Sequence, residues 1–348
     1  MSKRIVALPG DGIGTEIMDS ALAILEEIMI QDELDFDIEK FAFGGAGIDE
    51  KSDPLPQETL EACEKADAIL LGAIGGPKWD NAPKRPEQGL LGLRKALGLF
   101  ANIRPISVPA AVVHLSPLKE ENVRGVDFVV VRELTGGIYF GEKTLGETEA
   151  SDLCTYSKAE VERIIRKAFE IAQTRNKKVT SVDKANVLAT SKLWRQTADA
   201  VAKEFPDCEL EHQLVDSAAM VMITKPKSFD VIVTENLFGD ILSDEASVIP
   251  GSLGMMPSAS HSESGPSLYE PIHGSAPDIA NQNIANPMSM ILSTAMMLRQ
   301  SFALDHSAKK IENACDRVMN QGILTTDLGG SATTTDFTEA VIKELRGA

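Results

Sequence analysis

The sequence has few cysteines, few aromatic residues and no long hydrophobic run. Only 5% of its 348 residues are aromatic, and its four cysteines are scattered with no CxxC pair: Cys63, Cys154, Cys208 and Cys315. Together with five histidines that show no metal-ligand spacing, this argues against a disulfide framework and against structural zinc. The longest apolar stretches, residues 5–8 and 288–298, are too short for a signal peptide or a membrane span. We therefore expect a cytoplasmic protein that does not associate with membranes.

Basic residues are also in the minority. The chain has 34 Lys and Arg against 52 Asp and Glu, which gives a net charge of −18. Nucleic acid and anionic membranes both attract cationic proteins, so neither is expected as a partner. An anionic substrate would require a local group of basic residues. The proportions of hydrophobic (43%) and charged (25%) residues are ordinary for a globular protein, and the length is sufficient for about two domains.

Segments typical of buried strands alternate with segments of helical periodicity. The strands are expected at residues 4–8, 36–43, 68–76, 128–132, 178–184, 209–215 and 230–234. Helices are expected at residues 15–29, 56–65, 158–174 and 236–247, followed by three amphipathic helices near the end of the chain. Residues 250–266 are rich in Gly, Ser, Met and Pro and are expected to form a long loop. This alternation predicts an α/β fold with helices layered on a sheet.

The first expected strand leads into a glycine-rich segment with Gly10, Gly12 and Gly14. The segment invites comparison with a dinucleotide-binding turn, but the spacing is G-x-G-x-G rather than G-x-G-x-x-G. Asp11 lies within it and would repel a pyrophosphate. We therefore interpret the segment as a tight turn into a helix.

The segment at residues 236–247, Asn-Leu-Phe-Gly-Asp-Ile-Leu-Ser-Asp-Glu-Ala-Ser, places Asp240 and Asp244 four residues apart. On a helix both carboxylates leave the same face and repel each other, so a cation is expected between them: Lys, Arg or a divalent metal. Carboxylate oxygens favour Mg²⁺ or Mn²⁺ over zinc. The alternative from spacing alone is a solvated helix face. The preceding buried strand would place the helix start where open α/β sheets bind ligands.

Three arginines follow apolar segments: Arg94, Arg104 and Arg132. Arg132 closes an apolar strand, which is an unfavourable place for a cation unless an anion meets it. Guanidinium groups bind carboxylates through paired hydrogen bonds, so three converging arginines would bind a malate-like dicarboxylate. Ordinary surface ion pairs in an acidic protein are the alternative.

Several motifs together resemble one family. Residues 236–247, the arginine segments, Asp-Lys-Ala-Asn-Val at 183–187 and His-Gly-Ser-Ala-Pro-Asp at 273–278 are similar to the signature of the β-decarboxylating dehydrogenases, which act on 3-isopropylmalate, isocitrate, homoisocitrate or tartrate. The resemblance runs nearly end to end. It implies two open α/β domains around a shared sheet with a cleft between them, and NAD binding of a non-Rossmann kind.

The resemblance also implies domain limits and roles. Residues 1–99 and 252–348 would form the cofactor-binding domain, and residues 100–251 would bind substrate and metal and form the homodimer contact, with an arm near 138–156. The three arginines would bind the substrate. Tyr139 would protonate the product enolate, and Lys184 would assist removal of the hydroxyl proton. From the residues alone, Tyr139 could merely cap a sheet edge, and Lys184 could be an exposed lysine at a strand end.

The metal and cofactor residues follow from the same resemblance. Mg²⁺ or Mn²⁺ would bind to Asp240, Asp244 and Asp216, and Asp216 would also contact substrate. Asp216 and Lys184 would come from the partner subunit. NAD would contact Glu270, His273, Gly274, Ser275, Ala276, Pro277, Asp278, Ile279 and Asn286. Asp278 can accept hydrogen bonds from ribose hydroxyls and would repel a 2′-phosphate, so NAD is expected rather than NADP.

Choice of substrate within the family depends on an apolar wall of Leu90, Leu91 and Val187. Burying the three carbons of an isopropyl group is worth roughly 2 kcal/mol, whereas the extra carboxylate of isocitrate would be left unpaired at a cost of several kcal/mol. The expected reaction is oxidative decarboxylation of (2R,3S)-3-isopropylmalate to 4-methyl-2-oxopentanoate and CO₂, a step of leucine biosynthesis. Malate or tartrate is the alternative within the family. A metal-dependent lyase or phosphoryl-transfer enzyme without nucleotide, and a non-catalytic acidic assembly protein, are alternatives of other classes.

Overall fold

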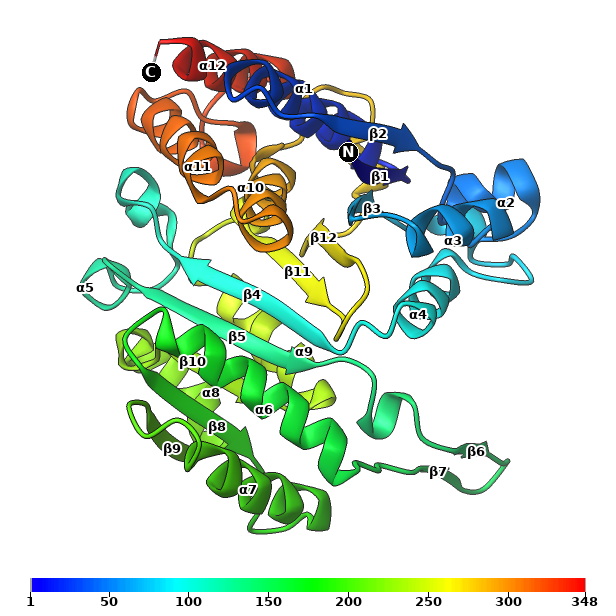
Figure 1. Cartoon of the computed structure of the whole chain (residues 1–348), viewed down its shortest axis with the longest axis vertical. Coiled ribbons are helices and arrows are strands. Elements are labelled where there is room, and N and C mark those ends of the chain that lie inside the picture. The colour runs from blue at the N-terminus through cyan, green and yellow to red at the C-terminus, as the bar shows by residue number, and fades with distance from the viewer. Residues whose placement is uncertain (1, 348) are drawn as a thin grey trace. The chain divides into compact units, whose positions relative to one another are not determined.

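The computed structural model describes residues 2–347, which form two compact units. Among the described residues, 2–99 together with 252–347 make the first unit, and Phe100–Gly251 make the second. Each unit consists of helices packed on a β-sheet (Figure 1), so the predicted α/β class is confirmed. Within residues 2–347, no helix has the length and apolar character that crossing a membrane requires.

The first unit contains strands in the order β2-β1-β3-β12-β11. They are β1 (Lys3–Gly10), β2 (Phe36–Lys40), β3 (Ala68–Ala73), β11 (Pro257–His261) and β12 (Ser267–Pro271). β1 is parallel to β2 and β3, and β12 is parallel to β3, whereas β11 pairs antiparallel with β12. β11 lies within the segment predicted as a long loop, so that prediction is wrong. Its Pro, Ser and Ala side chains are small and buried and carry no apolar sequence signal.

The helices of the first unit are α1 (Gly14–Gln31), α2 (Gly45–Lys51), α3 (Gln57–Glu64), α4 (Pro86–Ala96), α10 (Met288–Phe302), α11 (Asp305–Asn320) and α12 (Thr334–Arg346). α1 and α11 each pack against both α10 and α12, as the upper part of Figure 1 shows. α11 and α12 bury one side only, as predicted. α10 is buried on nearly all sides because it also contacts β3, β11 and β12. The prediction that this helix is amphipathic is therefore wrong.

The second unit contains strands in the order β4-β5-β10-β8-β9. They are β4 (Ala101–Ser107), β5 (Asp127–Glu133), β8 (Lys178–Asp183), β9 (Glu209–Leu214) and β10 (Val231–Thr234). All neighbouring pairs are parallel except β4 with β5. The inner strands β5 and β10 are almost entirely buried and each contains a run of apolar residues, which explains why the sequence predicted them.

The helices of the second unit are α5 (Glu120–Val123), α6 (Lys158–Gln173), α7 (Ala189–Ala202), α8 (Val215–Thr224) and α9 (Asn236–Ser247). In Figure 1, α6 and α7 lie in front of the strands, and α8 and α9 lie behind them. α9 packs against α8 and contacts β4, β5 and β10. The prediction of a helix directly after a buried strand is confirmed here.

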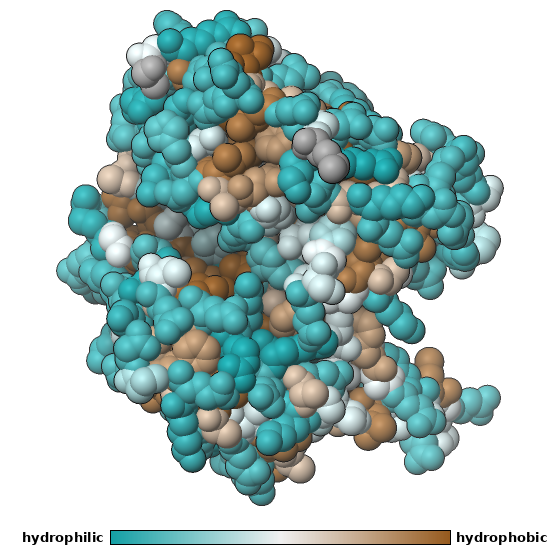
Figure 2. Space-filling model, in the orientation of Figure 1, coloured by the Kyte–Doolittle hydropathy of each residue, from teal (hydrophilic) through white to brown (hydrophobic). Residues whose placement is uncertain are grey.

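A small hairpin of β6 (Lys143–Leu145) and β7 (Ala150–Asp152) projects from the second unit (Figure 1). All six strand residues are exposed, including Leu145 at 92%. The surface shown in Figure 2 is mostly hydrophilic, as the acidic composition leads one to expect, but hydrophobic residues also appear on this hairpin. An exposed leucine at the tip of a projecting hairpin costs solubility unless another surface covers it.

Candidate active site

Helix α9 carries the two predicted carboxylates at the carboxyl end of β10. One oxygen of Asp240 accepts a hydrogen bond from the Arg132 guanidinium, and the other accepts one of 2.8 Å from the Tyr139 hydroxyl. Asp244 accepts a hydrogen bond of 3.0 Å from Nη1 of Arg104. The cations expected beside this pair of carboxylates are therefore arginines in this chain.

Arg132 is held in place before any substrate arrives. Its side chain is buried, and its Nε and Nη2 donate hydrogen bonds of 3.0 and 2.9 Å to Oδ1 of Asn236, the first residue of α9. Gly239 makes this approach possible, because a Cβ at that position would lie 2.6 Å from Cγ of Arg132. The guanidinium therefore joins the end of β5 to the first two turns of α9 in a preorganised position.

Arg104 is also fixed along its length. Its Nε donates to Oδ1 of Asn102 at 2.8 Å, and its Nη1 donates to Oγ of Ser243 at 2.8 Å. In the β4–β5 register Asn102 is paired with Arg132, and Arg104 lies two residues further along β4. Because successive side chains alternate across a strand, both arginines project toward α9.

Tyr139 lies in a short 3-10 turn after β5. Its ring lies 5.9 Å from the Arg132 guanidinium. Burial, with a further contribution from the hydrogen bond to Asp240, raises the pKa of Tyr139. The phenol therefore keeps its proton at neutral pH and is poised as a donor rather than a base.

Lys184 directly follows β8, and its ammonium group forms an ion pair with Asp216. The hydrogen bond from Lys184 lowers the pKa of the Asp216 carboxyl. Asp216 lies in the first turn of α8 and not at the end of a strand, because β9 ends at Leu214. Within residues 2–347 no group of three or more His, Cys, Asp or Glu is arranged to hold a metal. A single chain therefore does not bring Asp216 together with the two carboxylates of α9.

A row of buried acids lies beside these residues. Thr234 of β10 is paired with Arg132 of β5 and with Val182 of β8. The next residue along each strand is an acid: Glu133, Glu235 and Asp183. All three are buried, although sequence reasoning did not single them out. The only signal was an acidic residue at the end of three apolar strands.

Two of these acids have cationic partners, and the middle one has none in the part of the chain that the structure describes. Asp183 accepts hydrogen bonds of 2.8 and 2.9 Å from Arg195. Glu133 lies 3.5 Å from Arg163 and accepts hydrogen bonds from the backbone of Thr135 and Gly136. For Glu235, no side-chain hydrogen bond or ion pair is found within residues 2–347. Burial, with the charges of Asp183 and Glu133, raises the pKa of Glu235 to about 7.

The first unit holds the third predicted arginine and two residues of the predicted wall. Arg94 of α4 forms an ion pair with Glu270 at 2.9 Å, and its buried Nε has no hydrogen-bond partner within residues 2–347. On the same helix, Leu91 is 48% exposed, whereas Leu90 packs partly against the core of this unit. Val187, in the second unit, is exposed.

The segment predicted to bind the cofactor follows β12 and contains a 3-10 turn, Pro277–Ile279. Nδ1 of His273 bonds to the carbonyl of Gly274 at 2.9 Å, while its Nε2 is buried without a hydrogen-bond partner within residues 2–347. Burial lowers the pKa of His273, so the ring is neutral and Nε2 is an unused acceptor. Asp278 is exposed at the start of the turn.

Asn286 is already engaged within the first unit. Its Nδ2 donates to Asp327 at 3.0 Å, and its Oδ1 accepts from the backbone of Met288 at 3.0 Å, next to the start of α10. Asp327 also accepts a hydrogen bond of 2.5 Å from Thr325 and raises the pKa of His273 by its charge, against the larger effect of burial. Asp327 was missed from the sequence, which contains no motif around it.

Comparison with known proteins shows which family this chain belongs to. A family model described as isocitrate/isopropylmalate dehydrogenase matches residues 4–341. The chain belongs to this family. The resemblance inferred from the motifs is thereby confirmed.

Relatives named 3-isopropylmalate dehydrogenase match along the whole chain. The protein of Listeria monocytogenes is 69% identical over 348 residues, covering 100% of this chain and 99% of its own length. Those of Streptococcus thermophilus and Staphylococcus saprophyticus are 67% and 59% identical, covering 99% of this chain and 100% of their own lengths.

Two solved structures of isocitrate and β-decarboxylating dehydrogenases have the same fold. Isocitrate dehydrogenase from Methylococcus capsulatus has a TM-score of 0.89 at 35% identity, with 99% of each chain covered. A β-decarboxylating dehydrogenase from Thermococcus kodakarensis has a TM-score of 0.84 at 36% identity, with 99% of this chain and 96% of that chain covered.

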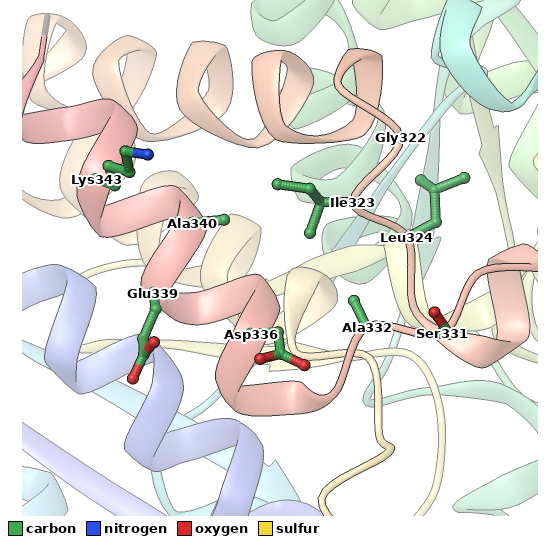
Figure 3. A pocket seen from close by; sticks show the side chains of 9 residues that line it. All are labelled: Gly322, Ile323, Leu324, Ser331, Ala332, Asp336, Glu339, Ala340 and Lys343. Atoms are coloured by element: carbon green, nitrogen blue, oxygen red, sulfur yellow. The ribbon is translucent and has the colours of Figure 1, made fainter.

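A hollow of about 640 Å³ lies away from all predicted site residues. It is formed by one face of α12 and the segment that follows α11, and Figure 3 shows Ile323 of that segment opposite Ala340. Its rim carries Asp336, Glu339 and Lys343 (Figure 3). It contains no residue that the family resemblance or the site geometry assigns to chemistry.

Proposed function

We propose that this protein is an NAD-dependent and divalent-metal-dependent dehydrogenase that converts (2R,3S)-3-isopropylmalate to 4-methyl-2-oxopentanoate and CO₂ in leucine biosynthesis. Full-length relatives with this enzyme name support the assignment. The observation that carries it is the contact of Asp240 with both Arg132 and Tyr139, because it joins a carboxylate-binding cation, a metal ligand and a proton donor in one place.

The arginines account for recognition of a dicarboxylate. Arg132 and Arg104 present guanidinium groups fixed by Asn236 and Asn102, which lowers the entropic cost of binding carboxylates. Arg94 contributes a buried Nε–H that has no hydrogen-bond partner within residues 2–347. A buried hydrogen-bond donor without an acceptor favours the binding of an anionic ligand. Together these groups supply the positive charge that a malate-like substrate requires in an acidic protein.

The donor set suits a hard cation. Asp240 and Asp244 offer oxygen ligands from successive turns of α9, and 73% of the Asp244 side chain is exposed, so it is open to a ligand. Mg²⁺ and Mn²⁺ prefer such oxygens. We assign the third carboxylate to Asp216 of the neighbouring subunit, because one chain does not group the three.

The segment after β12 fits an adenine nucleotide. The buried Nε2 of His273 is an acceptor without a donor within residues 2–347, and an exocyclic amine of an adenine is a suitable donor. Asp278 is exposed and can accept hydrogen bonds from ribose hydroxyls. We assign the first unit to cofactor binding and the second to substrate, metal and dimer contacts.

The reaction needs two proton movements from this chain. Lys184 assists removal of the 2-hydroxyl proton while the C2 hydride leaves, and the bond from C3 to its carboxylate then breaks to release CO₂. Tyr139, which keeps its proton because of burial and Asp240, protonates C3. When bound, NAD accepts the hydride and the metal withdraws electron density from the new carbonyl group.

We further propose that the protein works in the cytoplasm as a homodimer. α8 exposes Met220, α9 exposes Ile241, and Val248 directly after α9 is also exposed. A second copy could cover these three apolar side chains. The hairpin with Leu145 is the proposed arm. In this dimer, Lys184 and Asp216 of one subunit complete the site that contains Asp240 of the other.

A complementation experiment tests the shared site. Lys184→Ala and Asp240→Asn chains are each expected to be inactive as homodimers. Unfolding and refolding them together should restore NADH formation, because each mixed dimer contains one site with both native residues. If mixed dimers form and remain inactive, the exchange of Lys184 between subunits is wrong.

The overall reaction is tested by its products. The protein is incubated with 3-isopropylmalate, NAD and Mg²⁺, and 4-methyl-2-oxopentanoate and CO₂ are quantified against NADH. Equal amounts of all three, abolished by EDTA and restored by excess Mg²⁺, are expected. NADH without CO₂, or no product at all, would contradict the proposal.

A further inference from the structure

The glycine-rich segment between β1 and α1 contacts backbone rather than offering space for a phosphate. A Cβ on Gly10 would lie 1.9 Å from the carbonyl oxygen of Ala73, and one on Gly12 would lie 2.1 Å from the carbonyl oxygen of Ser275. Gly10 and Gly12 also adopt positive φ values of 72° and 57°, which favour glycine. The glycines are therefore required by close approach to two other segments of the first unit.

Asp11 is the charged residue at the centre of this packing. Its carboxylate is buried and accepts three backbone hydrogen bonds of 2.8 Å, from Gly45, Ala46 and Gly75. A carboxylate with several backbone donors is a strong anchor, because each bond is charge-assisted. Asp11 thus holds the start of α2 and the turn after β3 against the end of β1.

The same hydrogen bonds continue into the segment proposed to bind NAD. The carbonyl of Gly75, whose N–H is held by Asp11, accepts a hydrogen bond of 2.8 Å from Oγ of Ser275. The carbonyl of Ser275 in turn accepts one of 2.8 Å from the backbone N–H of Ile13. Ser275 is therefore anchored at its side chain and at its backbone, and both anchors lead back to the Asp11 turn.

This double anchor supports an unfavourable backbone conformation. Ala276 has φ 39° and ψ 61°, in the left-handed region, which is costly for a residue with a side chain. Such strain persists only where the surroundings over-determine it. The strained residue turns the chain into Pro277–Ile279 and so sets where Asp278 lies.

We propose that Asp11 is a positioning residue for the nucleotide: by accepting the hydrogen bond from the backbone N–H of Gly75 it holds Gly75, and through it Ser275, so that the segment from His273 to Asp278 is preformed for NAD. This inference rests on the proposed function for the identity of the ligand. Asp11 itself does not touch the cofactor. The acidic residue that argues against a pyrophosphate in the glycine turn thus acts on nucleotide binding indirectly.

The variant Asp11→Asn tests this role. An amide has the same shape but carries no charge, and its NH₂ group must face at least one of the three backbone donors. We expect the KM for NAD and the Kd for NADH to rise about tenfold, with less than a threefold change, roughly, in the KM for 3-isopropylmalate. Hydrogen exchange of the backbone amides in residues 272–280 should become faster.

Asp32→Asn is the matched control. Asp32 is also an acid in the first unit, and it directly follows the last residue of α1. It accepts hydrogen bonds of 2.5 Å from Ser307 and from Lys310, both in α11. The Asp32→Asn variant should have a lower thermal stability, but an unchanged KM for NAD and unchanged hydrogen exchange of the backbone amides in residues 272–280. If both variants lose stability alike and neither changes nucleotide binding or exchange in this segment, the proposal is overturned.

Two further measurements cover the cases in which Asp11→Asn does not fold or the native protein does not bind NADH. If Asp11→Asn does not fold, Ser275→Ala replaces it, with Ser307→Ala as control, and the same selective weakening of NADH binding is required. If the native protein binds no NADH, the proposed cofactor is wrong, but hydrogen exchange still decides whether Asp11 holds residues 272–280. Unchanged exchange in that segment would overturn the positioning role whatever the ligand.

Discussion

Replacement of Glu235 by glutamine should remove a pH dependence of stability that the buried row of acids creates. Glu235 is 5% exposed and stands between Asp183, which pairs with Arg195, and Glu133, which pairs with Arg163. Its pKa is about 7 in the folded chain against 4.5 as the ordinary value. The folded protein therefore keeps a proton that the unfolded chain releases between these values.

The sign and size of this pH dependence of stability follow from proton linkage. Because the folded pKa is raised, the stabilisation is fully present below about pH 4.5 and is lost as pH rises through about 7. The free energy of unfolding changes by about 1.4 kcal/mol for each pH unit between the two pKa values. The native protein should therefore lose about 3 kcal/mol of stability relative to Glu235→Gln across this window. Glutamine keeps the shape of the neutral acid and does not ionise.

Urea unfolding of the native protein, Glu235→Gln and a control is the appropriate assay, with each measured at several values between pH 5 and pH 8. Glu147→Gln, at an exposed position in the hairpin, is the control and should follow the native protein throughout. The difference in the free energy of unfolding between native protein and Glu235→Gln should grow with pH across this range and flatten once the pH passes about 7. Parallel curves at all pH values would refute the reasoning, because they would mean that Glu235 titrates as an ordinary glutamate.

Three further substitutions test the site directly. Tyr139→Phe should lower kcat by roughly 100-fold or more while leaving the KM for NAD unchanged, because the proton donor is lost; steady-state kinetics decide this, and a native kcat would exclude the role. Gly239→Ala should raise the KM for 3-isopropylmalate about tenfold, since its Cβ would lie 2.6 Å from Cγ of Arg132; an unchanged KM would show that Arg132 does not depend on this approach. Leu91→Ala should lower kcat/KM about tenfold for 3-isopropylmalate but not for D-malate; equal losses would contradict the apolar wall.

Much of the fold could be predicted because its signals are local. The apolar runs of β5 and β10 and the periodicity of α6 and α9 place these elements within a few residues of the observed limits. β11 could not be predicted, because its small residues carry no apolar pattern and become buried only by pairing with β12. The same tertiary packing buries α10 on nearly all sides.

The sequence allowed the residues of the proposed site to be named, but it did not predict the contacts that they make. The spacing of Asp240 and Asp244 required a cation, and the structure supplies Arg132 and Arg104, a choice that spacing cannot make. The unpaired state of Glu235 depends on the register of three strands from distant parts of the sequence. The division of the chain into residues 1–99 with 252–348 and residues 100–251 likewise reflects long-range contacts, and only the family resemblance implied it.

The most direct test of the proposed activity is NADH or NADPH formation with Mg²⁺, measured for 3-isopropylmalate, isocitrate, D-malate and tartrate under NAD and under NADP. The account predicts turnover that strongly favours 3-isopropylmalate with NAD, as the wall at Leu91 and the acid at Asp278 require. Preference for isocitrate or a smaller hydroxy acid, or for NADP, would contradict it.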